Sequence, residues 1–172
     1  MGKTLLHLAS IRGPVEIVCK LIEHGADVMV QNNDGQTPSH LASILGQVEV
    51  AQILIEHDAD VRFQDKCGNT PSHLALQEGQ VEVTRVLVER GADVTTRNQD
   101  GETLLHMSLL LGQAEVSRML IEHGADVATR NKDGGTHYIW RCFRVKWKSL
   151  ACSLSTVRMW RPRTGMGRLH YI

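Results

Sequence analysis

A pattern that returns every 33 residues limits what this chain can fold into more than any other feature. A glycine, one variable residue and a threonine recur in the same order along the sequence. The five copies are Gly2-Lys3-Thr4, Gly35-Gln36-Thr37, Gly68-Asn69-Thr70, Gly101-Glu102-Thr103 and Gly134-Gly135-Thr136. A fixed period of this length indicates one small structural unit repeated in tandem, so we expect units stacked along a line.

The first copy also matches the end of a phosphate-binding loop, in which a lysine and backbone amides hold a nucleotide. In the later copies the lysine is replaced by Gln, Asn, Glu and Gly, so it is not a required phosphate ligand. We therefore interpret Gly2-Lys3-Thr4 as part of the repeat and expect no nucleotide site.

Four complete units align without insertions, and we number them one to four. They span residues 2–34, 35–67, 68–100 and 101–133. In unit two, Thr37 can cap a helix and Pro38 suits its first position, which predicts a first helix of about two turns ending at Gly46. Alternating apolar and polar faces predict a second helix over 48–57.

Helices this short are marginal in water, because nucleation costs more than two or three turns recover. They must bury their apolar faces against neighbouring units. The sequence therefore predicts an all-α solenoid of stacked helix–turn–helix units, with polar hairpin-like loops projecting along one edge.

The residues Thr37-Pro38-Ser39-His40-Leu41-Ala42, with their counterparts in the other units, resemble the ankyrin repeat and its T-P-L-H-x-A pattern. The resemblance covers residues 2–133 and implies an ankyrin-repeat solenoid that binds other proteins and is not an enzyme. Departures are few: leucine replaces the proline in units one and four, and serine replaces the leucine in units two and three. Asp58 replaces the glycine after the second helix, which predicts a less stable unit two.

In the ankyrin family, the hairpin tips and the exposed end of the first helix form a concave binding face. Carried onto this chain, the resemblance implies the partner-binding residues Ile11, Arg12, Asn33, Gln36, Ile44, Leu45, Lys66, Asn69, Gln77, Glu78, Gln99, Glu102, Leu110 and Leu111. Apolar residues expected at a surface often mark an interface, so Ile44, Leu45, Leu110 and Leu111 are candidate anchors. The alternative is that they pack within their own turn.

Repetition also explains the residues that could suggest chemistry. His7, His40, His73 and His106 occupy one position per unit, so we expect them to bond to neighbouring turns and not to converge on a metal. Histidines at 24, 57 and 123, with arginine at 90, are expected to close the second helices, where positive charge suits the dipole. Aspartates at 27, 60, 93 and 126 are predicted to form turns. We expect no catalytic set, cofactor, metal or small-molecule substrate.

Charge and composition divide the chain at residue 134. Residues 1–133 hold 11 Lys and Arg against 19 Asp and Glu, whereas residues 134–172 hold eight basic residues and no acidic ones. The net charge of −8 on the four units favours a basic protein partner and argues against nucleic acid. Aromatic residues make up only 4% of the chain, so the core is expected to be aliphatic.

Three interpretations of residues 134–172 remain open. The segment is a truncated fifth repeat produced by an error in the gene model, a terminal helix that covers unit four, or a basic aromatic tail that binds membrane or nucleic acid. Helical spacing favours the second through the apolar residues Ile139, Phe143, Trp147, Leu150, Leu154 and Val157.

The sequence shows no signal peptide, no long apolar run and no disulfide spacing among its four cysteines. We therefore expect an intracellular location, in the cytoplasm or the nucleus. Both ends of the repeat region suggest a piece of a longer array. An alternative to the simple scaffold is the targeting or adaptor arm of a larger protein, for example in substrate recognition by a ubiquitin ligase.

Overall fold

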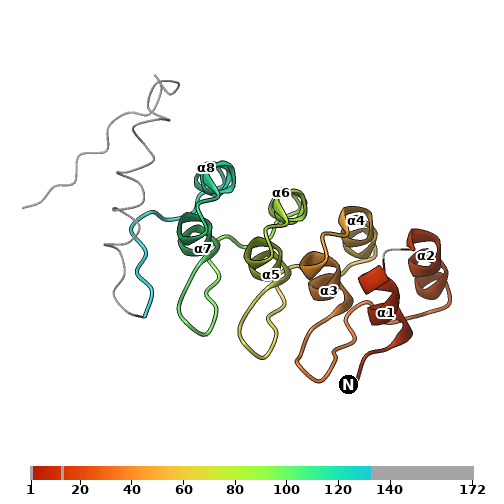
Figure 1. The fold of residues 1–172 in the computed structure, drawn as a ribbon. Helices are drawn as coiled ribbons and strands as arrows, with labels where there is room; N and C mark the ends of the chain where they lie inside the picture. Colours follow the sequence, from red (N-terminus) through yellow and green to blue (C-terminus); the bar gives the residue numbers. More distant parts are fainter. Residues whose placement is uncertain (1, 13, 133–172) are drawn as a thin grey trace, which may run out of the picture.

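The computed structural model describes residues 2–12 and 14–132, and all regular elements of these residues are helices. Each of the four units contributes two helices joined by a tight turn (Figure 1). The helices are α1 (Leu5–Arg12), α2 (Val15–Glu23), α3 (Pro38–Ile44), α4 (Val48–Glu56), α5 (Pro71–Gln77), α6 (Val81–Glu89), α7 (Leu104–Leu110) and α8 (Ala114–Glu122). The predicted all-α solenoid is confirmed, and the predicted helices of unit two are correct to within one residue.

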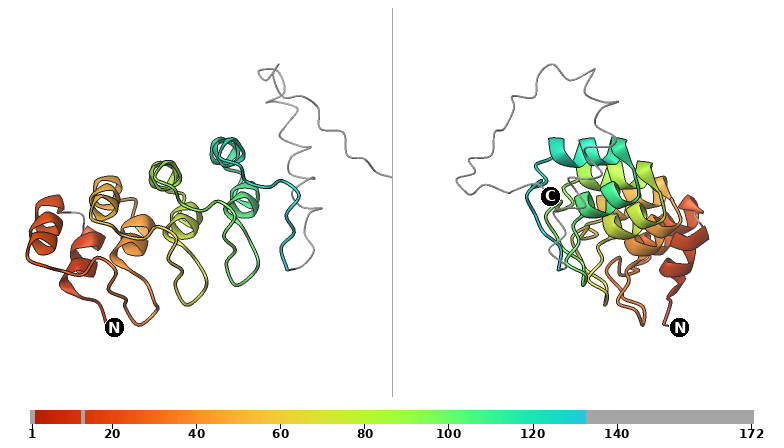
Figure 2. Two further views of the ribbon diagram at one scale, coloured as in Figure 1. Left: turned by 180° about the vertical axis from the view of Figure 1, so that it is seen from behind. Right: turned by 60° about the vertical axis from the view of Figure 1, so that its left-hand side comes forward.

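The helices form two rows that run the length of the stack. The first helices of the units (α1, α3, α5 and α7) pack in one row, and the second helices (α2, α4, α6 and α8) pack in another. Long loops project on the side away from the second helices, as the two further views show (Figure 2). One side of the stack is therefore made of second helices, and the other combines loops with first helices.

The start of each first helix is fixed by a threonine and the histidine three residues later. In unit two, His40 Nδ1 accepts a hydrogen bond from the Thr37 backbone N–H at 3.2 Å and lies 2.8 Å from the Thr37 hydroxyl. Pro38 occupies the first helical position, where its missing N–H costs no hydrogen bond. The threonine was predicted as a cap, but the reciprocal role of the histidine was not.

The turn between the two helices requires glycine. Gly46 has φ +71°, in the left-handed region that residues with a Cβ rarely adopt. A Cβ at this position would also lie 2.3 Å from Oε1 of Gln80, which belongs to the next unit. Gly46 therefore both ends α3 and admits a side chain from the neighbouring unit.

Second helices end at the residues that the sequence indicated. His24, His57, Arg90 and His123 are the C-terminal caps of α2, α4, α6 and α8. The ring nitrogen Nδ1 of His24 lies 2.7 Å from the Lys20 carbonyl, and that of His123 lies 2.9 Å from the Met119 carbonyl. The Lys20 and Met119 carbonyls also accept the backbone N–H groups of His24 and His123, so ring and main chain meet at the same carbonyl near the end of the helix.

The core is aliphatic, as the composition predicted, and it consists of two clusters, one with residues of units one to three and the other with residues of units three and four. Leu54, Leu87 and Leu120 occupy the same position in three successive second helices and are fully buried. Each such leucine contributes roughly 1.5–3 kcal/mol through burial. Because each cluster contains residues of more than one unit, the stability of one unit depends on its neighbour.

Unit one exposes positions that the later units bury. Leu5 is 70% exposed, whereas Leu104 at the equivalent position of unit four is completely buried. Leu8 and Ile17 are also exposed, and Leu41 and Val50 of unit two are buried in the corresponding places. Leu6, by contrast, belongs to the core and is 2% exposed.

One residue of unit two departs from the repeated backbone geometry without changing the fold. Asp58 adopts φ +66°, and it is the single residue other than glycine with positive φ in the described part of the chain. The equivalent residues of the other units are Gly25, Gly91 and Gly124, all in the same left-handed region. Residue 133, the last of unit four, and residues 134–172 lie outside the described residues, so the three interpretations of that segment stay open.

Candidate protein-binding surface

Each hairpin loop is shaped by one side chain at its base. Asn32 Oδ1 accepts hydrogen bonds from the backbone N–H groups of Asp34 at 2.8 Å and Gln36 at 2.9 Å. Asp65 and Asn98 make the same pair of contacts in the next two loops. These residues were not among the predicted site residues, although their recurrence every 33 positions was a signal for a common role.

Neighbouring loops are bonded to one another through their backbones. The N–H of Lys66 donates to the Asp34 carbonyl at 3.0 Å, and the N–H of Gln99 donates to the Cys67 carbonyl at 3.0 Å. Farther along, the Gln64 side chain donates to the Arg97 carbonyl at 2.8 Å. The loops therefore form a connected edge and not a set of independent tips.

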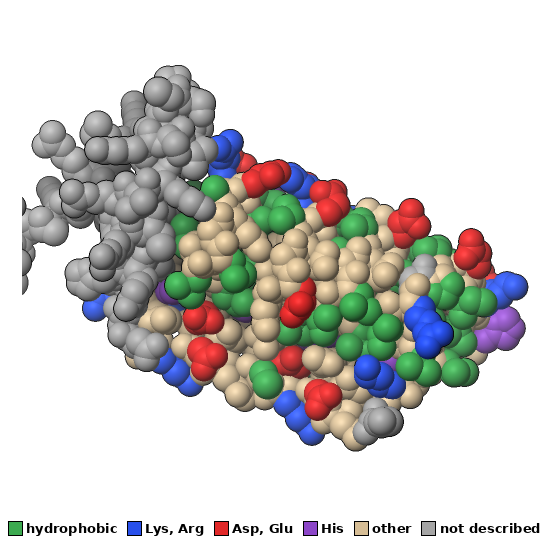
Figure 3. All heavy atoms as spheres, viewed as in Figure 1, with side chains coloured by type: hydrophobic (Ala, Val, Ile, Leu, Met, Phe, Trp, Pro, Cys, Tyr) green, Lys and Arg blue, Asp and Glu red, His purple; other side chains and the backbone are tan. Residues whose placement is uncertain are grey.

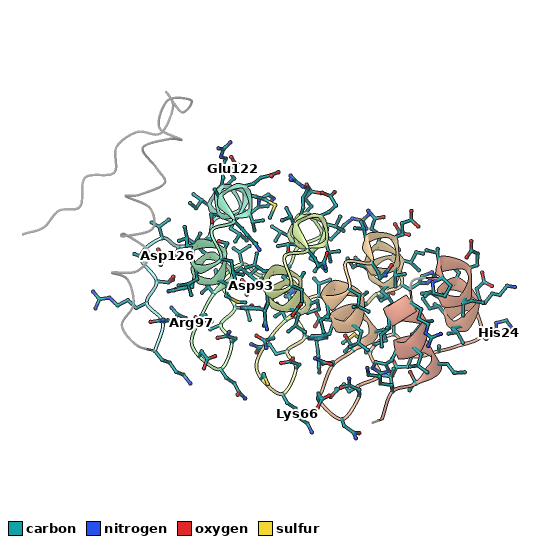
Figure 4. All side chains as sticks on the ribbon, in the orientation of Figure 1. His24, Lys66, Asp93, Arg97, Glu122 and Asp126 are labelled. Atoms are coloured by element: carbon teal, nitrogen blue, oxygen red, sulfur yellow. The ribbon has the colours of Figure 1, made fainter. Side chains whose placement is uncertain are left out.

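The structure divides the predicted tip residues into two groups. Asn33, Lys66 and Gln99 are exposed, whereas the second group, Gln36, Asn69 and Glu102, is half-buried. Lys66 projects from its loop on the side away from Glu122, which lies on α8 in the row of second helices (Figure 4). The backbone carbonyls of Gln36 and Asn69 face His7 Nε2 at 3.0 Å and His40 Nε2 at 3.1 Å. The half-buried group thus serves the scaffold through its main chain.

The predicted residues at the ends of the first helices are mostly exposed. Leu45, Leu110 and Leu111 are 44%, 57% and 50% exposed, whereas Ile44 is half-buried. Three of the four candidate anchors are thus exposed at the surface, and Ile44 is only partly accessible. In unit three the equivalent residues, Gln77 and Glu78, are both exposed.

These ends lie side by side because the first helices pack in sequence. Apolar side chains gather over α3 and over α7, and an acidic side chain lies over α5 between them (Figure 3). We call the eight residues at these ends the helix-end row. It consists of Ile11, Arg12, Ile44, Leu45, Gln77, Glu78, Leu110 and Leu111.

The four repeated histidines belong to the scaffold. Because His40 Nδ1 accepts the Thr37 N–H, its hydrogen is on Nε2, which donates to the Asn69 carbonyl of the next unit. The predicted contact with a neighbouring turn is confirmed for His7 and His40. The Nε2 atoms of His73 and His106 are buried without such a hydrogen bond.

Burial favours the neutral imidazole in His40, His73 and His106. Desolvation lowers the pKa of His73 to about 4, despite opposing contributions from the Glu102 carbonyl and the Asp65 charge. Desolvation also lowers the pKa values of His40 and His106. A buried neutral imidazole held by a threonine cap serves the structure of the helix start.

The aspartates predicted as turn formers fill that role in all four units. The Oδ1 atoms of Asp27, Asp60, Asp93 and Asp126 each accept the backbone N–H two residues ahead, at 2.8–2.9 Å. The two hydrogen bonds from Thr95 lower the pKa of Asp93. These carboxylates therefore fix the chain direction after each second helix.

The outer row of second helices carries exposed ion pairs. Arg85 bonds to Glu82 on its own helix and to Glu115 of the next unit, and Arg90 lies 3.6 Å from Glu56. Exposed pairs of this kind contribute little to stability.

Over residues 2–12 and 14–132, no cluster of histidine, cysteine, aspartate or glutamate could hold a metal ion. Within the same residues, no helix has the length and apolar character needed to cross a membrane.

Comparison with known proteins assigns the repeats. The family model for ankyrin repeats, described as three copies, matches residues 1–65 and again residues 58–131. No curated protein matches the chain. The family match agrees with the threonine–histidine caps and the four stacked helix pairs. The chain therefore belongs to the ankyrin-repeat family, whose repeats are modules for protein–protein interaction.

Proposed function

We propose that the chain is a scaffold that binds a protein partner on the helix-end row and the adjoining exposed loop residues Asn33, Lys66 and Gln99. The observation that carries this proposal is the exposure of Leu45, Leu110 and Leu111 at positions where the fold does not require an apolar side chain. At the equivalent positions, unit three has the exposed polar residues Gln77 and Glu78, and it forms the same pair of helices.

A partner that covers these leucines would gain the free energy of removing them from water. Each is about half exposed, so complete burial would contribute roughly 1 kcal/mol per side chain. The polar loop residues beside them would form a rim that excludes water, the arrangement in which a few anchors supply most of the affinity. Exposed acids beside the leucines, Glu78 among them, favour a partner with basic residues.

The test uses the full chain as bait for cross-linking and mass spectrometry, with Leu45→Glu and Leu111→Glu combined in one variant. Introducing two carboxylates into the interface would leave them desolvated and unpaired, so we expect at least a tenfold loss of the specific partner. The matched control is Ile17→Glu, because Ile17 is 47% exposed but lies on α2, away from the row.

Loss of the partner in the double variant and its retention in the control would support the proposed surface. Equal retention by both variants would show that the partner binds elsewhere. Loss with Ile17→Glu alone would place the interface on the open side of unit one.

A further inference from the structure

Four equivalent positions in the helix-end row differ in chemistry from one unit to the next. Arg12 is the last residue of α1, and Leu45, Glu78 and Leu111 directly follow α3, α5 and α7. All four side chains are exposed, and successive members are 33 residues apart. Read along the stack, the order is a cation, an apolar group, an anion and an apolar group.

The preceding residue of each unit forms a second column beside the first. Ile11 and Ile44 are half-buried, while Gln77 and Leu110 are exposed. This column is apolar except in unit three. In both columns, unit three is therefore polar and lies between the apolar positions of units two and four. The single charge of this polar region is the carboxylate of Glu78.

The spacing of the row limits what can lie along it. Adjacent packed helices are about 8–10 Å apart, so a partner must present one side chain about every 10 Å along the same side. An α-helix does this with about seven residues, which rise about 10.5 Å and turn back to within about 20° of the same face. An extended strand covers the distance with about three residues, and because its side chains alternate, successive contacts would fall on opposite faces.

A helix also matches the two columns. Its residues three or four positions apart lie next to each other on one face, so it can contact both columns at every unit. Charge complementarity then sets the residue types: a basic side chain opposite Glu78, an acidic one opposite Arg12, and apolar ones opposite Leu45 and Leu111.

Building on the proposed function, we infer that the helix-end row recognises an amphipathic α-helix that lies along the stack. The helix carries two apolar residues about 14 positions apart and a lysine or arginine midway between them. An acidic residue lies about seven positions beyond the apolar residue that contacts Leu45. The apolar contacts supply affinity, and the two charge contacts set the orientation of the helix.

The test is selection of displayed helical peptides on the full chain. The probe is a library of alanine-rich helices of about four heptads, randomised among Glu, Lys, Leu and Ser at one position per heptad. We expect enrichment of the order Glu, Leu, Lys, Leu, read from either end of the peptide. A second selection uses Glu78→Lys, and we expect the favoured residue between the two leucines to change from Lys to Glu, with at least a tenfold reversal in affinity.

Glu89→Lys is the matched control, because Glu89 is exposed at the end of α6 outside the row. This control must keep the preference for Lys. The selected helices could lose binding to the Leu45→Glu and Leu111→Glu variants while Glu78→Lys still favours Lys between the two leucines of the peptide. That result would overturn this inference and leave the proposed surface intact. Selected helices that bind all row variants equally would contradict both. Failure to enrich any of the four-residue patterns would overturn the inference.

Discussion

The two ends of each first helix contrast sharply. At the start, the same threonine–histidine pair recurs in all four units, with hydroxyl-to-ring distances of 2.7–2.9 Å. At the other end, the equivalent residues are an arginine, a glutamate and two leucines, and all are exposed. Residues that repeat hold the units together, whereas residues that differ face the solvent. Stability and selectivity are therefore expected to respond to changes at opposite ends of the same helices.

The largest expected effect is at the start of α3. His40→Ala removes the acceptor of the Thr37 N–H, the bond to the Asn69 carbonyl and a fully buried ring. We expect the free energy of unfolding to fall by about 3 kcal/mol, from unmet backbone groups and the cavity together. Urea denaturation followed by circular dichroism measures this change. A loss below about 1 kcal/mol would mean that the repeated start does not hold the units together.

Acid is expected to weaken the same end of the helices. The pKa of His73 is about 4 in the folded chain, below the ordinary value of 6.5. The unfolded chain therefore binds more protons between these values, and stability is lost as the pH falls from about 6.5 toward 4. Between pH 7 and pH 5, His73 alone should cost roughly 2 kcal/mol. The burial that lowers the pKa values of His40 and His106 adds to the loss.

Urea titrations at pH 7 and pH 5 measure this dependence. The comparison variant is His24→Gln, because His24 is exposed and does not belong to the threonine–histidine pairs at the starts of the first helices. It should show the same pH-dependent loss as the wild type. A wild-type stability that does not change over this range would refute the assignment of buried neutral imidazoles.

A smaller effect, a gain in stability, is expected at Asp58, where the other units have glycine. Asp58→Gly replaces the aspartate at φ +66° with the residue that favours this geometry, and should raise the free energy of unfolding by about 0.5–1 kcal/mol. Thermal denaturation would detect the higher midpoint. Asp60→Gly is the neighbouring control and should destabilise, because it removes the acceptor of the Arg62 N–H. If both changes act alike, the backbone angle does not explain the effect.

The smallest effect on stability is expected at the varied ends. Leu45→Glu and Leu111→Glu alter side chains that are half exposed, so each should change the free energy of unfolding by less than about 0.5 kcal/mol. Urea denaturation followed by circular dichroism measures this change as well. A loss of 2 kcal/mol or more would show that these leucines belong to the core and would remove the contrast between the two ends.

Much of the fold follows from local sequence signals. The period, the threonine cap, Pro38 and Gly46 place the helices of unit two, because each residue acts within its own turn. The turn-forming role of Asp60 is equally local, since its carboxylate bonds to a backbone N–H two residues ahead. These features could be predicted without knowledge of the neighbouring units.

The remaining features depend on how the units meet. Ile44 and Leu45 are adjacent and similar, yet Leu45 is 44% exposed whereas Ile44 is half-buried. Likewise, Leu6 lies in the sequence between the exposed Leu5 and Leu8, yet it belongs to the buried core cluster. Helical direction and packing decide these outcomes, and composition does not reveal them. The placement of a partner on the helix-end row stays a prediction.

Several hydrogen bonds across the joints between units share one chemical property. His7, His40, Gln64, Gln80 and Gln113 each reach a main-chain carbonyl oxygen of an adjoining unit. A carbonyl is present at every residue, so these bonds do not depend on which side chains the adjoining unit carries. A gene segment encoding one unit can therefore be duplicated, deleted or exchanged by recombination while these joints keep their bonding partners. The same geometry allows the number of modules to change over evolutionary time while the exposed ends diversify independently.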